Sequence, residues 1–126
     1  MSRPLTFATV LAGVLWLPAC TGGEKHSGYN KRAVSPVRLS RPAEDQLKIQ
    51  YAAPAETLFY SPGVDFAVRG DTLRVTLRRC GIKEACAVMA KAAMPAAEAG
   101  TMEVTVPYGG RRVVVLYADG EEQLSP

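Results

Sequence analysis

Between residues 44 and 120, apolar and polar side chains alternate in several short runs. The clearest is Thr72–Arg78, where Leu73, Val75 and Leu77 are apolar and the residues between them are polar. Successive side chains of a β-strand point to opposite faces, so a period of two predicts a strand with one buried face. Related patterns predict four more strands, at residues 47–51, 57–60, 64–69 and 102–106. A sixth, at residues 113–117, is apolar on both faces, which is typical of a central strand.

Glycine-containing turns separate some of these strands. Gly70-Asp71 follows one strand and precedes the next. Gly109-Gly110 stands between the last two strands, and glycine supplies the positive φ that two-residue hairpins need. The sequence therefore predicts hairpins at both places.

The alanine-rich stretch from Glu84 to Met94 has a different period. Its apolar residues recur at spacings of three and four, and Pro95 follows it. This pattern is typical of one face of a helix, so we expect a short helix here. A strand that ends in an irregular loop is the alternative.

These elements together predict a mainly β fold with about six strands and one short helix. A small antiparallel β-sandwich, Ig-like or transthyretin-like in outline, accommodates them. A single sheet packed by the helix is the alternative. The chain has 126 residues, which limits it to one domain, and we assign that domain to residues 44–120.

Two segments beside this domain are polar. Residues 20–43 have few large apolar side chains and five basic residues against one acidic residue, which predicts a flexible basic tether. Residues 121–126 form a polar tail. From residue 44 onward, nine basic residues face eleven acidic ones, so the basic character of the chain is concentrated in the tether.

The N-terminus has the pattern of an export signal. Arg3 precedes an uncharged apolar run from Leu5 to Leu17, which is shorter than the roughly 20 residues that span a bilayer. The run ends in Leu17-Pro18-Ala19-Cys20, which resembles the lipobox of bacterial lipoproteins. An ordinary secretory signal, with Cys20 a plain thiol, is the alternative.

The lipoprotein resemblance implies an address. Residues 1–19 would be removed, and Cys20 would carry the acyl chains that hold the protein to a membrane. Thr21, rather than aspartate, after that cysteine implies the outer membrane of a Gram-negative cell, with the domain facing the periplasm. We therefore expect an envelope protein as partner, no nucleic acid, and no cofactor beyond the lipid.

The cysteine count fits this address. Lipidation of Cys20 leaves Cys80 and Cys86, which an oxidising periplasm would let form a disulfide. Redox or metal chemistry is the alternative. It is less favoured because five residues separate the cysteines rather than two, and the one histidine, His26, lies in the tether.

Arginines form the candidate partner-binding set. Arg74, Arg78 and Arg79 lie in or beside one strand, and Arg111 and Arg112 could join them on one exposed sheet face. Such a face would suit an acidic partner or polymer. A solvated polar face is the alternative.

The residues from 44 onward contain no histidine and none of the familiar nucleophile motifs, so we assign no catalytic residue. We expect a non-enzymatic outer-membrane lipoprotein whose domain binds another envelope component, in an assembly, secretion-accessory or structural role. The alternative is an inhibitor or immunity-type protein that inserts the loop Gly81–Ala87 into a periplasmic enzyme. An enzyme or ligand carrier is the third hypothesis.

Overall fold

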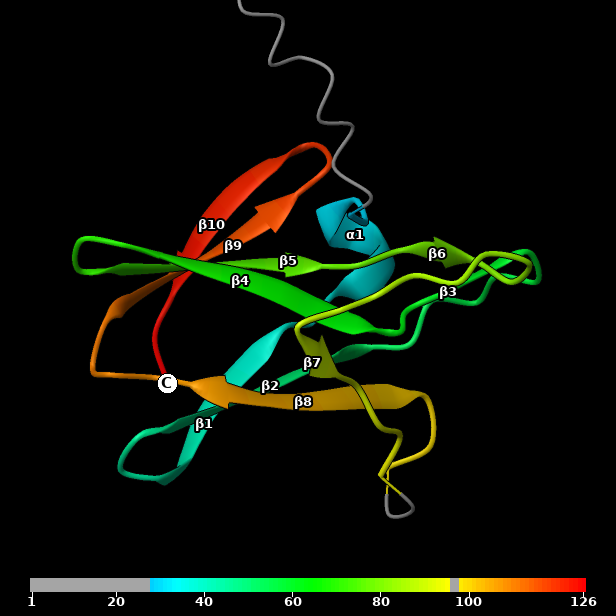
Figure 1. Cartoon of the computed structure of the whole chain (residues 1–126). Helices are drawn as coiled ribbons and strands as arrows, with labels where there is room; N and C mark the ends of the chain where they lie inside the picture. The colour runs from blue at the N-terminus through cyan, green and yellow to red at the C-terminus, as the bar shows by residue number, and fades with distance from the viewer. Residues whose placement is uncertain (1–27, 96–97) are drawn as a thin grey trace, which may run out of the picture.

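The mainly β prediction is confirmed. In the computed structural model, which describes residues 28–95 and 98–126, the chain forms one four-residue helix, α1 (Lys31–Val34), and ten strands (Figure 1). The strands are β1 (Arg38–Ala43), β2 (Gln46–Ala52), β3 (Phe59–Tyr60), β4 (Gly63–Arg69), β5 (Thr72–Leu77), β6 (Cys80–Gly81), β7 (Ala90–Lys91), β8 (Thr101–Pro107), β9 (Arg112–Tyr117) and β10 (Gly120–Leu124).

The strands form three sheets. One has the order β1-β2-β8, the second has the order β10-β9-β5-β4-β7, and β3 and β6 pair in a separate two-stranded sheet. All six strands predicted from the hydrophobic pattern are present, and β1, β6, β7 and β10 are additional. The apolar-on-both-faces strand, β9, is central, between β10 and β5.

The core lies between the two larger sheets. Leu47 and Ile49 of β2 stand opposite Val106 and Val104 of β8, and their side chains are buried. They pack in one cluster with apolar residues of the five-stranded sheet, including Val75 of β5. Each fully buried aliphatic side chain stabilises the fold by about 1.5–3 kcal/mol, so the alternating positions of these strands hold the two sheets together.

One pair of neighbouring strands is parallel. β5 and β4 form the expected hairpin, with Gly70 at a φ of +61° in the turn. β9, however, runs parallel to β5, so the prediction of a wholly antiparallel arrangement is wrong for this pair. The chain enters the five-stranded sheet from β8, and β9 then lies beside β5 and runs in the same direction. Two parallel strands cannot be connected by a hairpin.

The predicted hairpin at Gly109-Gly110 is also wrong. Both glycines have positive φ, at +61° and +66°, so the turn itself is present. It connects β8 to β9, which belong to different sheets and lie in different layers (Figure 1). The turn therefore carries the chain across the core instead of reversing it within one sheet.

The domain extends beyond its predicted limits at both ends. Tyr29 and Val34, within the segment assigned to the tether, are buried in the core, and β1 lies at one edge of the three-stranded sheet. The tail residues Glu121–Leu124 pair along β9 as part of β10. Composition alone missed these segments because only a few apolar side chains, at alternating or isolated positions, attach them to the core.

The helix predicted at Glu84–Met94 is wrong. Within this stretch the structure has the short strand β7, which pairs with Gly63 and Val64 of β4, and a bridge from Ala93 to Glu103 of β8. A helix of about ten residues is marginal on its own propensity. Here the backbone instead hydrogen-bonds to the edges of both sheets, which overrides the local preference for a helix.

Two buried tyrosines predict loss of stability at alkaline pH. Burial raises the pKa of Tyr29 and of Tyr117 to about 12, with smaller contributions from Glu56 and Glu122 respectively. Tyrosine in the unfolded chain titrates near pH 10. The folded state therefore retains protons that the unfolded state loses, so stability is full below pH 10 and falls as pH rises toward 12.

Replacing both tyrosines with phenylalanine should flatten this decline. Neither hydroxyl has a hydrogen-bond partner among the residues that the structure describes, so Tyr29→Phe and Tyr117→Phe should change stability little at neutral pH. Urea unfolding followed by circular dichroism at pH 8 and pH 11 measures the difference. Parallel losses in the wild type and the double variant would show that other groups cause the decline.

Candidate functional site

The five predicted arginines do not form one continuous row. Arg74, Arg78 and Arg112 lie at outward-facing positions of the five-stranded sheet, on β5, just after β5, and on β9. Arg79 lies beside β3, and Arg111 lies in the turn before β9. The structure thus brings three of the five to one face and leaves two elsewhere.

Most of these arginines are held in ion pairs. Arg78 pairs with Asp65, Arg74 with Glu121 at 3.3 Å, Arg79 with Glu56 at 2.8 Å, and Arg112 with Asp71 at 3.8 Å. Exposed pairs of this kind contribute about 0–1 kcal/mol each, so they matter little to stability. They do neutralise much of the charge that an acidic partner would meet.

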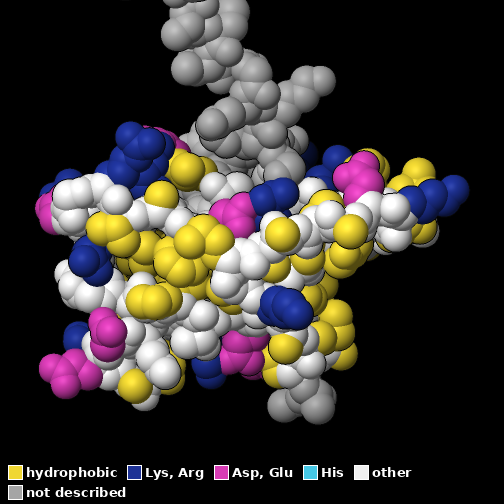
Figure 2. All heavy atoms as spheres, in the orientation of Figure 1, with side chains coloured by type: hydrophobic (Ala, Val, Ile, Leu, Met, Phe, Trp, Pro, Cys, Tyr) yellow, Lys and Arg dark blue, Asp and Glu magenta, His cyan; other side chains and the backbone are white. Residues whose placement is uncertain are grey.

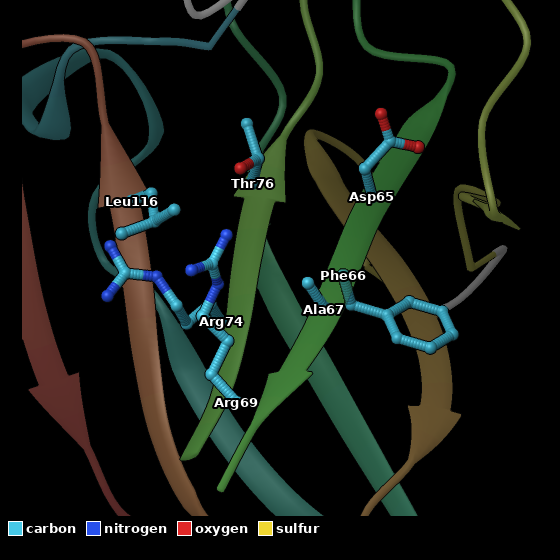
Figure 3. A pocket seen from close by; sticks show the side chains of 7 residues that line it. All are labelled: Asp65, Phe66, Ala67, Arg69, Arg74, Thr76 and Leu116. Atoms are coloured by element: carbon cyan, nitrogen blue, oxygen red, sulfur yellow. The ribbon is translucent and has the colours of Figure 1, made fainter. Parts of the chain in front are cut away.

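A shallow concavity of about 440 Å³ lies on the same outer face. Figure 3 shows the side chains of Arg69 and Arg74 extending over this face, together with Thr76 and Leu116. Arg69 was missed by the sequence analysis, and it makes no ion pair with any residue that the structure describes. Arg69 lies on the same face of β4 as Asp65 and Ala67, and the alternation of the sequence could have indicated this.

A second feature stands away from both larger sheets. β3 and β6 pair, with Phe59 opposite Gly81 and Tyr60 opposite Cys80, and the Ile82 amide donates to the Leu58 carbonyl at 3.0 Å. We call residues 57–60 and 80–86 the projecting ribbon. Figure 1 shows it extending to one side of the domain, beyond the ends of β4 and β8.

Three contacts fix the base of the projecting ribbon. The predicted disulfide is confirmed: Cys80 and Cys86 are bonded, with their Cα atoms 6.1 Å apart. The Arg79 guanidinium lies 3.5 Å above the Phe59 ring and donates to Glu56 through Nη2 at 2.8 Å. These hydrogen bonds raise the pKa of Arg79 above its ordinary value. The ribbon is therefore anchored at several points rather than attached by two loose strands.

The outer end of the projecting ribbon carries two exposed apolar side chains beside the exposed Lys83 and Glu84. Leu58 and Ile82 are adjacent, and their side chains are 65% and 54% exposed. Tyr60 of the ribbon is also exposed. An isolated exposed apolar residue needs no explanation, but a contiguous apolar patch marks an interaction site.

A concavity of about 580 Å³ adjoins the ribbon. It is lined by Tyr60, Ser61, Pro62, Cys86, Ala87, Val88, Lys91, Ala92 and Met102. The lining is mostly apolar, and one wall includes the disulfide loop. The exposed apolar side chains of the ribbon and the adjoining concavity give this end of the molecule a surface shape that a protein partner can complement.

The sequence singled out the loop Gly81–Ala87, which contains Ile82, but it did not single out Leu58. Leu58 lies in the predicted strand 57–60, where an apolar residue is expected to be buried. Only the pairing of β3 with β6, away from the core, shows that both side chains face solvent.

One group of metal-ligand types occurs among the described residues. Ligand atoms of Cys80, Glu84 and Cys86 all lie within 4.8 Å of one another. Cysteine binds a metal ion as a thiolate, and both sulfurs are joined in the disulfide. In this form the group stabilises the ribbon and offers a single carboxylate.

In comparisons with known proteins, no family model, no curated protein and no solved structure matches this chain. Within the described residues, no helix has the length and apolar character needed to cross a membrane.

Proposed function

We propose that this chain is a non-enzymatic outer-membrane lipoprotein whose periplasmic domain binds another protein of the envelope. The lipobox-like motif ending at Cys20 supports the anchor; it lies outside the described residues. We further propose that the domain is a small β-sandwich related in outline to Ig-like or transthyretin-like domains, since two sheets share one core.

The observation that carries the binding function is the pair of exposed apolar side chains at the outer end of the projecting ribbon. Leu58 and Ile82 are each more than half exposed to water, whereas the apolar residues of the core are buried. Covering such side chains with a partner releases about 25 cal/mol per Å² of apolar surface. The disulfide and the Arg79 contacts reduce the ordering that binding would otherwise require.

An enzyme inhibitor is the second candidate function. The loop Gly81–Ala87 lies at the end of the projecting ribbon and is closed by the Cys80–Cys86 disulfide. A rigid, protruding loop of this kind can enter the cleft of an enzyme. This candidate predicts a soluble one-to-one complex with a single periplasmic enzyme, whereas the first predicts a membrane-associated assembly.

Two substitutions test the proposal in a Gram-negative host. Cys20→Ala should abolish labelling of the protein by radioactive palmitate, and labelling that persists would contradict the anchor. Leu58→Lys should lower the amount of copurified partner by about tenfold or more, since central apolar contacts dominate interface energies.

Thr105→Lys is the matched control for the second substitution. Thr105 is exposed on β8, so this variant adds the same charge away from the ribbon. It should retain the partner. Equal loss in both variants, or in neither, would contradict binding through the ribbon.

A further inference from the structure

Within the described residues, half of β4 has a neighbouring strand on one side only. On one side β4 pairs with β5 over its whole length from Val64 to Arg69. On the other side β7 pairs only with Gly63 and Val64. In the part of the chain that the structure describes, Phe66–Arg69 therefore forms an open sheet edge, which we call the β4 edge.

The backbone groups that face this edge can be assigned. The Phe66 amide donates to the Met89 sulfur at 3.4 Å, so Phe66 directs its amide away from β5. Backbone direction alternates along a strand, so the amide and carbonyl of Val68 face the open side as well. A thioether is a weak hydrogen-bond acceptor. A backbone carbonyl of an added strand is a stronger acceptor and would take its place.

The two faces of the β4 edge differ in chemistry. Phe66 and Val68 lie on the core side, where Val68 is 50% exposed, and Figure 2 shows hydrophobic side chains gathered between β4 and β8 on this side of the molecule. Ala67 and Arg69 lie on the outer side. Neither Arg69 nor Lys91 of β7 makes an ion pair within the described residues.

We infer that the β4 edge binds an extended segment of another protein in which apolar and acidic residues alternate. The segment adds a strand to the five-stranded sheet, and its backbone pairs with Phe66 and Val68. Its apolar side chains cover Phe66 and Val68, and its carboxylates meet Arg69 on the outer face. Alternation of the segment follows from the period of two that any added strand must have.

A second copy of this chain fits the edge less well. Self-pairing through Phe66–Arg69 would bring another Arg69 to the same outer face. The nearby carboxylate of Asp65 already accepts from the Met89 amide at 3.0 Å and pairs with Arg78. A partner that supplies its own carboxylates satisfies the charge that self-pairing would double.

Two peptides test the inference on the full chain in detergent. The probe is a capped, fluorescently labelled seven-residue peptide that alternates valine and glutamate, and the control peptide alternates valine and lysine. Fluorescence anisotropy should show binding of the glutamate peptide about tenfold tighter than that of the lysine peptide. Equal affinity for the two peptides would overturn the inference that the bound segment is acidic.

Substitutions on β4 test the geometry. Val68→Pro removes the open-side amide, a change that edge strands tolerate, and should weaken binding of the glutamate peptide about tenfold more than Val68→Ala does. Arg69→Glu should reverse the preference between the two peptides, and it keeps the inference falsifiable if the proline variant does not fold. Unchanged binding in Val68→Pro or unchanged preference in Arg69→Glu would overturn strand addition.

Two further outcomes separate this inference from its neighbours. Concentration-dependent dimers of the wild type that disappear in Val68→Pro would show that the edge takes a second copy, and would overturn the inference. Leu58→Lys should leave peptide binding unchanged. Failure of the ribbon as a binding site and failure of the β4 edge are thus measured by different variants.

Discussion

Replacing Gly63 with alanine is expected to destabilise the domain by about 3 kcal/mol or more. Gly63 begins β4 with a φ of +155°, a conformation that side chains rarely adopt. A Cβ placed there would lie 1.9 Å from the carbonyl oxygen of Ala90, which is backbone of β7 and cannot rotate away. The variant therefore has to separate β7 from β4, and urea unfolding followed by circular dichroism measures the cost.

Gly120→Ala is the matched control. Gly120 has the same φ of +155°, but apart from its chain neighbours no described residue has an atom within 4 Å of the position of its added Cβ. It should lose only the conformational contribution, about 1–3 kcal/mol. If the two variants lose equal stability, close packing of β7 against β4 does not explain the glycine at position 63.

Replacing Val34 with aspartate is expected to cost about 3–5 kcal/mol, a large part of the stability of a small domain. Val34 is fully buried, and it lies in α1 within the segment whose composition predicts a tether. An aspartate there places a charge in the core without a partner. Thermal and urea unfolding of the variant measure the loss.

Ala33→Asp supplies the comparison from the neighbouring position. Ala33 is exposed in the same helix, so this change should stay within about 0.5 kcal/mol of the wild type. A Val34→Asp variant as stable as Ala33→Asp would mean that the segment from residue 28 to 43 does not belong to the core.

The strands were predictable wherever buried and exposed positions alternate along the chain. Leu73, Val75 and Leu77 alternate with polar residues because β5 has the core on one side and water on the other. β9 was recognisable as central because Val114 and Leu116 are apolar on its outer face too. These features are local in sequence, so one chain is enough to show them.

Pairing partners were not predictable in the same way. The stretch Glu84–Met94 has a helical period, yet Ala90 and Lys91 pair with β4. That outcome depends on a free edge formed by residues more than twenty positions away. The parallel alignment of β9 with β5 and the exposure of Leu58 likewise depend on how separate segments meet.

The candidate site was predictable only in its covalent part. Two cysteines left over after Cys20 predicted the disulfide, and the structure confirms it. The arginine row was drawn from proximity in sequence, and the structure divides it among separate ion pairs. Ile82 lies in the loop Gly81–Ala87, which the sequence singled out. Leu58, the other residue of the proposed binding surface, gave no signal because its exposure depends on how β3 pairs with β6.

Photocrosslinking in cells shows whether the projecting ribbon is a protein-binding surface. A benzoylphenylalanine is introduced at position 58 on the ribbon or at position 105 on β8, in the full chain in its membrane. We expect one abundant adduct with a single envelope protein from position 58 and none from position 105. Adducts of equal yield from both positions, or none from position 58, would contradict it.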